Sequence, residues 1–148
     1  MSISKINGET IIAAFGGGYS LRGTLANSSA NPIAGTPYYG GGAAGAGISG
    51  TVDSRRIYIP KTGTIKSCYG YFNQTASASG NTGTLSINVN NGAYTTISTA
   101  AHNVVSTVYY NNSLSIAVTQ GNYIEFKWTC PATTAPTNMT SSFIIYIE

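Results

Sequence analysis

Charge is scarce in this chain. Asp, Glu, Lys and Arg make up 7% of its 148 residues, whereas about 25% is usual in soluble domains. The seven basic residues are spread out, and only Arg55 and Arg56 are adjacent, so the clustered basic stripe of a nucleic-acid-binding protein is missing. We therefore expect no nucleic-acid partner. Ser, Thr, Asn and Gly fill the polar positions, and such a neutral surface is typical of extracellular proteins, repeat assemblies and virus particles.

Cysteine and histidine are also few: the chain has Cys68, Cys130 and His102. Two cysteines are too few for a disulfide scaffold. We expect buried thiols, with a single bridge as the alternative. One histidine and two distant thiols do not make a four-ligand zinc set. The small and polar neighbours of His102 indicate a loop and predict a surface histidine, not the base that a Ser or Cys nucleophile needs.

Long hydrophobic runs and paired acids are missing too. No segment approaches the ~18 apolar residues of a membrane span, and Ile11–Phe15 is too short for the core of a signal peptide. Glycosidases pair two carboxylates across a cleft. Among the four acids, Glu125 alternates with Lys127 on an expected outer face. The other three acids are Glu9, Asp53 and Glu148. We therefore predict no catalytic residue, no metal, no cofactor and no enzyme activity.

Alternation of apolar and polar residues is what the chain does have. Between Gly121 and Pro131, one face of the segment carries Ile124, Phe126, Trp128 and Cys130, and the other carries Tyr123, Glu125 and Lys127. A period of two indicates a strand, and proline ends it because proline cannot donate to the ladder. We place this strand in the middle of a core.

Similar short strands fill residues 53–148. They are expected at Ile57–Ile59, Ile65–Phe72, Leu85–Val89, Tyr94–Ile97, Val104–Tyr110, Leu114–Val118 and Phe143–Ile147. Asn91-Gly92 predicts a two-residue hairpin turn of the primed type, because both residues tolerate positive φ. The pattern predicts an all-β fold, an eight-stranded antiparallel jelly-roll sandwich, as the domain 53–148.

Residues 1–52 differ from the rest because they are rich in Gly and Ala. We interpret them as an extended arm with up to two short strands, which orders against a partner. Gly45–Gly50 matches G-x-G-x-x-G, but a strand follows it where a dinucleotide site needs a helix, so we interpret it as a linker. The side chains that could hold the arm on a partner are Ile12, Phe15, Tyr19, Leu21, Tyr38 and Tyr39.

Tyrosine is abundant, with eleven copies, and two adjacent pairs occur, Tyr38-Tyr39 and Tyr109-Tyr110. In an extended segment, at least one ring of such a pair points outward. We predict Tyr109 and Tyr110 as exposed interface tyrosines, since tyrosine joins apolar area to a hydroxyl. Packing at the edge of the sheet is the alternative.

Several segments of residues 55–148 resemble a jelly-roll module of bacteriophage structural proteins, found in head decoration proteins and tail-fibre tips. These segments are Arg56–Ile65, Leu114–Val118, Gly121–Trp128 and the loop from Pro131 to Thr137 before a final strand. Two positions depart from that family: Asn122 stands where Asp is usual, and Thr133-Thr134 where a Trp is common. If that loop binds a ligand in relatives, the ligand here differs.

The resemblance implies a virion protein that commonly forms homotrimers. The expected function is a non-enzymatic capsid decoration or cement protein, assembled in the host cytoplasm and bound to the phage head through its arm. Its partners would be copies of itself and the major capsid protein or another virion protein. The alternative is the receptor-binding tip of a tail fibre or spike that recognises a host surface glycan.

Overall fold

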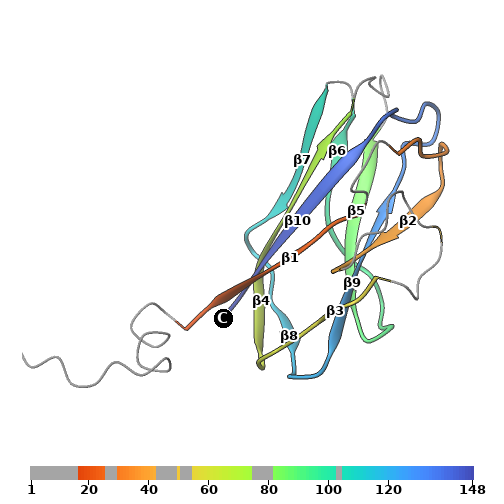
Figure 1. The fold of residues 1–148 in the computed structure, drawn as a ribbon. Coiled ribbons are helices and arrows are strands. Elements are labelled where there is room, and N and C mark those ends of the chain that lie inside the picture. The colour runs from red at the N-terminus through yellow and green to blue at the C-terminus, as the bar shows by residue number, and fades with distance from the viewer. Residues whose placement is uncertain (1–16, 26–29, 43–49, 51–54, 75–81, 103–104) are drawn as a thin grey trace, which may run out of the picture.

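The computed structural model describes residues 17–25, 30–42, 50, 55–74, 82–102 and 105–148, and within them it contains strands and turns but no helix (Figure 1). Ile12 and Phe15 lie outside the described residues. The ten strands are β1 (Tyr19–Gly23), β2 (Pro37–Gly40), β3 (Ile57–Tyr58), β4 (Gly63–Asn73), β5 (Thr82–Val89), β6 (Thr95–Ala101), β7 (Ser106–Asn111), β8 (Ile116–Val118), β9 (Tyr123–Thr129) and β10 (Thr140–Ile147).

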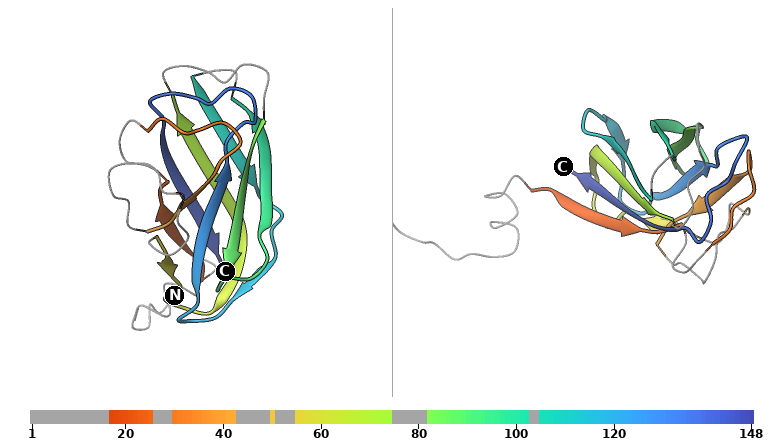
Figure 2. Two further views of the ribbon diagram at one scale, coloured as in Figure 1. Left: turned by 90° about the vertical axis from the view of Figure 1, so that its right-hand side faces the viewer. Right: turned by 90° about the horizontal axis from the view of Figure 1, so that it is seen from above.

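These strands form two sheets that pack face to face (Figure 2). The first has the order β1-β10-β4-β7, with β8 also paired to β4, and the second has the order β2-β9-β5-β6, with β3 also paired to β9. All the strand pairs are antiparallel. We call the first sheet the β4 sheet and the second the β9 sheet.

The strand order is that of a jelly roll. Strand β3 pairs with β9 beyond β2, and β8 pairs with β4 beyond β7, so the ten segments fill eight strand positions. Successive positions pair from the outside of the sequence inward: β1 with β10, β2 and β3 with β9, β4 with β7 and β8, and β5 with β6. The expected eight-stranded antiparallel sandwich is confirmed.

The make-up of those eight positions differs from the prediction. Strands β1 and β2 come from the segment interpreted as an arm, and they pair with β10 and β9. Leu25 has no exposed surface and Tyr38 stacks on Trp128 with ring centroids 6.3 Å apart. The boundary at residue 52 was therefore wrong for residues 19–25 and 30–42. Tyr19, Leu21 and Leu25 alternate with polar residues, but the surrounding residues are rich in Gly and Ala. The partner strands show that both segments belong to the sandwich.

The core lies between the inner faces of the two sheets. From the β9 sheet Phe126 and Trp128 point inward, and Phe126 stacks on Phe143 of the β4 sheet at 4.2 Å between ring centroids. Cys68 and Cys130 are buried and unbonded, which confirms the expected thiols. Burial raises the pKa of each thiol to about 12, so neither is a ready nucleophile.

A hairpin joins β5 to β6, as predicted, but its turn lies one residue earlier. Asn90 and Asn91 have φ of 50° and 59°, and the Gly92 amide donates to the Val89 carbonyl at 2.9 Å. Both central residues are thus left-handed, as a primed turn requires. Asparagine tolerates this backbone nearly as well as glycine, so the Asn-Asn pair takes the turn and Gly92 follows it.

Both long sides of the sandwich are linked between the sheets. On one side, Thr24 and Gly41 exchange two backbone hydrogen bonds of 2.9 and 3.0 Å. On the other side, the backbone amide of Tyr110 donates to the Ser98 hydroxyl at 3.1 Å. The side-chain amide of Asn111 donates to the Ile97 carbonyl at 3.2 Å. These bonds join the two sheets at one place on each long side.

Candidate functional site

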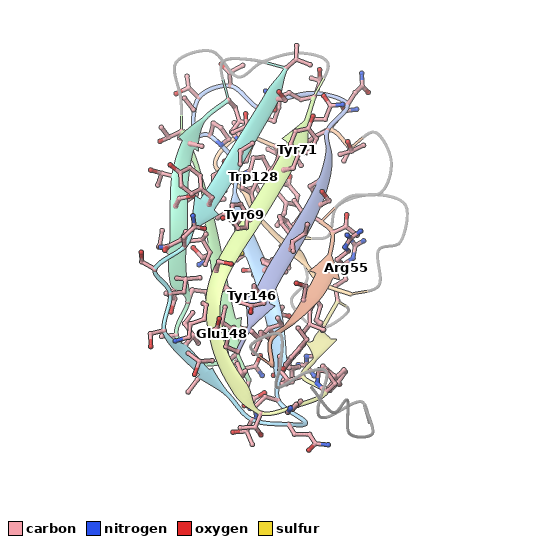
Figure 3. All side chains as sticks on the ribbon, turned by 90° about the vertical axis from the view of Figure 1, so that its left-hand side faces the viewer. Arg55, Tyr69, Tyr71, Trp128, Tyr146 and Glu148 are labelled. Carbon is pink, nitrogen blue, oxygen red and sulfur yellow. The ribbon has the colours of Figure 1, made fainter. Side chains whose placement is uncertain are left out.

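The outer face of the β4 sheet gathers exposed apolar side chains. Among the described residues, eight large hydrophobic side chains are exposed, and five of them lie on this face. We call these five the tyrosine face: Tyr69, Tyr71, Val108, Tyr110 and Ile144, with 40% to 60% of each side chain exposed. Figure 3 looks onto this face, with Tyr69 and Tyr71 on β4. A contiguous apolar patch of this kind is a candidate interaction surface.

Strand register makes the patch contiguous. Tyr69 of β4 lies opposite Tyr110 of β7 on one side and Ile144 of β10 on the other. The Tyr69 and Tyr110 rings stack with centroids 6.3 Å apart and planes 16° from parallel. Tyr71 lies opposite Val108. The patch therefore crosses three neighbouring strands, and cross-strand contacts hold its rings in place.

Sequence reasoning predicted only Tyr110 of this set. Tyr69 and Tyr71 alternate with Cys68, Gly70 and Phe72, which are all buried. That alternation was the available signal: inward positions in β4 are apolar or small, so the tyrosines between them had to face outward.

Tyr109 was predicted as exposed, and that prediction was wrong. Its ring has no exposed surface, because alternation along β7 turns Tyr109 inward and Tyr110 outward. The buried Tyr109 hydroxyl accepts a hydrogen bond of 2.8 Å from the Trp128 indole nitrogen. Tyr109 is thus a part of the core.

His102 was predicted as a surface residue, and it is buried with no exposed surface. The Tyr109 hydroxyl lies 2.5 Å from its Nε2, and Gln74 Oε1 lies 2.8 Å from its Nδ1. Because Gln74 Oε1 can only accept, Nδ1 carries the proton and Nε2 accepts from Tyr109. The Gln74 amide nitrogen also donates to the His102 carbonyl at 3.3 Å.

Each ring nitrogen of neutral His102 thus has a partner in this network. Burial lowers the pKa of His102 to about 4 and raises the pKa of Tyr109, so both groups are neutral at physiological pH. The arrangement holds one end of the sandwich together. It is the usual environment of a satisfied buried polar group, and it presents no activated nucleophile.

The outer face of the β9 sheet is charged. We call Arg56, Tyr94, Tyr123, Glu125 and Lys127 the charged face. Glu125 was predicted on an outer surface, but it is buried with no exposed area. The Tyr94 hydroxyl donates to Glu125 Oε2 at 3.3 Å. Lys127 Nζ lies 4.0 Å from the centroid of the Tyr94 ring, and the Arg56 guanidinium lies 4.0 Å from that of Tyr123.

Charges and aromatic rings on this face are therefore partnered within the chain. Burial and the neighbouring Glu125 carboxylate raise the pKa of Tyr94, which keeps its hydroxyl a donor. Each cation covers the face of a ring, an arrangement worth about 0.5–1 kcal/mol at exposed sites.

Metal-binding groups do not cluster in the described part of the chain: no three His, Cys, Asp or Glu side chains come together there. No pocket opens among the described residues either. None of these residues belongs to a helix long and apolar enough to cross a membrane. Glu9 and Asp53 lie outside the described residues.

The described residues define the class: an all-β jelly-roll sandwich that exposes aromatic side chains on the outer face of the β4 sheet. No family model matches the chain, and no curated protein matches it.

Several solved structures are weakly similar to this chain, including the following three. The Eiger TNF of S. frugiperda is 10% identical over 88% of this chain and 92% of its own, with a TM-score of 0.47. The GH26-CBM35 β-(1,4)-mannanase of Podospora anserina is 12% identical over 87% of this chain and 28% of its own, with a TM-score of 0.46. A structure of Desmodium yellow mottle tymovirus is 10% identical over 88% and 85%, with a TM-score of 0.33.

Proposed function

We propose that this chain is a non-enzymatic structural protein of a virion, a decoration or cement protein of a phage head that acts as a homotrimer. The observation that carries the proposal is the tyrosine face on a sandwich whose two long sides are linked. A contiguous exposed apolar face is a surface through which such a body can adhere. The scarcity of charge and the resemblance of residues 55–148 to phage jelly-roll modules support the same proposal.

Attachment to the capsid falls to the residues before β1. Of the side chains expected to hold an arm, Tyr19 and Leu21 pack against the core of the sandwich, and Tyr38 belongs to that core. Tyr39 lies beside Tyr94, with ring centroids 6.4 Å apart. These four side chains therefore have contacts within the chain. The attachment segment that we propose is residues 1–16, with Ile12 and Phe15 as its apolar contacts.

Deletion of residues 1–16 tests this attachment, because it leaves every described strand intact. The truncated chain should fold, with the far-UV circular dichroism spectrum of the full chain, and should no longer bind phage heads in co-sedimentation. The full-length double variant Ile12→Ser/Phe15→Ser is the matched control for chain length and should bind equally poorly. Undiminished binding of both proteins would contradict the proposal.

The second candidate is the tip of a tail fibre or spike that binds a host surface glycan. The tyrosine face favours it, because Tyr69, Tyr71 and Tyr110 offer rings and the Ser142 hydroxyl is exposed. The exposed Asn112 amide accepts from the Tyr69 hydroxyl through its oxygen. Apolar rings with a few polar groups are what small-ligand sites present. A glycan array, together with competition of the purified protein against infection, separates the candidates. Glycan binding without head binding would favour the tip.

A further inference from the structure

The chain enters β1 on the side of the sheet that carries the tyrosine face. Ile144 and Tyr146 alternate with buried residues along β10, so both point away from the core. Figure 3 shows Tyr146 on the same face of the sheet as Tyr69. A Cβ added at Gly18 would meet the Tyr146 hydroxyl and lie 2.6 Å from Cε2 of the same ring. The backbone just before β1 therefore lies against an outward-pointing ring.

A turn precedes this contact. Gly17 has a φ of 68°, a left-handed conformation that glycine adopts without steric cost, so the chain changes direction there. Residues 1–16 are therefore joined to the fold beside the Tyr146 ring, at the edge of the outer face of the β4 sheet.

The tyrosine face lies within reach of this point. One row of the strand register crosses the sheet through Arg22, Ile144, Tyr69 and Tyr110. From Gly18, the far end of this row is four residues along the strands and three strand spacings across, a direct distance of about 20 Å. Six extended residues span about 20 Å, so Ile12 can reach every position in the row. Phe15 is only three residues from Gly18 and stays close to Tyr146.

Residues 1–16 and the tyrosine face are both rich in apolar groups. The segment has six large apolar residues, which are Met1, Ile3, Ile6, Ile11, Ile12 and Phe15. Left apart, the two surfaces would keep these groups in water, and their burial against each other is favourable. A short tether gives the segment an effective concentration at the face on the order of millimolar. The chain's own segment thus has the advantage over a second copy at micromolar concentration.

We infer that residues 1–16 cover the tyrosine face of their own chain in the free protein, with Phe15 beside Tyr146 and Ile12 on the row of Tyr69 and Tyr110. The contact itself does not depend on the proposed attachment to a phage head. Its consequence for attachment rests on the proposed function: the same residues have to leave the face before they bind a head. The free protein then keeps both adhesive surfaces covered until it meets a particle.

Nitration by tetranitromethane tests the contact, because the reagent modifies accessible tyrosine rings and mass spectrometry of peptides locates them. Tyr110 and Tyr58 are 60% and 62% exposed on the sandwich, and each ring contacts one other tyrosine, but they lie on opposite sheets. Deletion of residues 1–16 leaves every described strand intact. It should speed nitration of Tyr110 about 10-fold, as expected for a face that is covered about 90% of the time. Tyr58 is the internal control and should react equally fast in both proteins.

The full-length variant Ile12→Ser/Phe15→Ser is the control for chain length and should react like the deletion. Circular dichroism and the thermal midpoint establish that each protein is folded. Equal nitration of Tyr110 in the wild type and in the deletion would overturn the inference. Protection of Tyr110 that disappears on dilution would assign the cover to another copy and would overturn it as well. Co-sedimentation with phage heads is measured separately, so failure of this contact leaves the proposed attachment to its own test.

Discussion

Tyr109 and Tyr110 are neighbours on β7, yet they belong to two different regions of the molecule. Tyr109 lies inside the sandwich, where its hydroxyl joins Trp128 to His102. Tyr110 lies on the tyrosine face, where 60% of it is exposed. The same residue type thus contributes to the core at one position and to the exposed face at the next, because successive side chains of a strand point to opposite faces.

Substitution Tyr109→Phe should lower the stability of the fold more than the other substitutions proposed below. Without the hydroxyl, the Trp128 indole N–H and His102 Nε2 lose their partner in a buried site, and each unsatisfied group costs about 1–3 kcal/mol. We expect the free energy of unfolding to fall by roughly 2–5 kcal/mol in urea titrations. Tyr110→Phe is the control and should change it by less than about 0.5 kcal/mol. Equal stabilities of the two variants would contradict the buried network.

Acid should lower the stability of the fold through buried His102, whereas no group of the tyrosine face takes part in this effect. His102 has a pKa of about 4 in the fold, below the unfolded value of 6.5, so its neutral form is stabilised by folding. Stability is independent of this group above pH 6.5, falls as the pH drops from 6.5 to 4, and is lower by about 3 kcal/mol below that range.

Thermal midpoints measured between pH 7 and pH 4 check this effect. The variant His102→Gln removes the titrating ring, while the carboxylates common to both proteins contribute equally. Wild type and variant should therefore differ in the slope of stability against pH. Parallel curves would show that protonation of His102 is not the cause.

Crowding the inner network should have a smaller effect. A Cβ added at Gly83 would meet the Tyr109 hydroxyl and lie 2.8 Å from the Trp128 indole nitrogen. Both groups belong to rigid rings, so Gly83→Ala should cost about 1–3 kcal/mol. Gly50→Ala, where no atom lies within 4 Å of an added Cβ, is the control in the same chemical denaturation. A Gly83→Ala protein as stable as the control would indicate a looser network.

On the tyrosine face, Tyr71→Ser should have the smallest effect on stability. Tyr71 is 48% exposed, and substitutions at such positions usually change stability by about 0.5 kcal/mol or less. The urea midpoint should stay close to that of the wild type. A large drop in stability would place Tyr71 with the inner region rather than with the surface.

Alternation in the sequence predicted the all-β fold and the buried face of β9, because Ile124, Phe126 and Trp128 repeat with a period of two. It could not orient β7, where Val108, Tyr109 and Tyr110 are apolar or aromatic at both parities. Nor could it find the partners of His102, since Gln74, Tyr109 and Trp128 come from separate segments. The roles of β1 and β2 stayed hidden for a related reason: their pairing, not their composition, brings them into the sandwich.

Strand β10 lies between β1 and β4 in the finished sheet, although it follows β1 by most of the chain. During synthesis at about 5–20 residues per second, β1 therefore waits on the order of ten seconds for its partner to emerge from the ribosome. Until then Leu25, Phe72 and Cys68 face water instead of Phe143 and Ile145. A cell that makes this protein in quantity has to shield those early segments, and slow or interrupted translation should send it into aggregates.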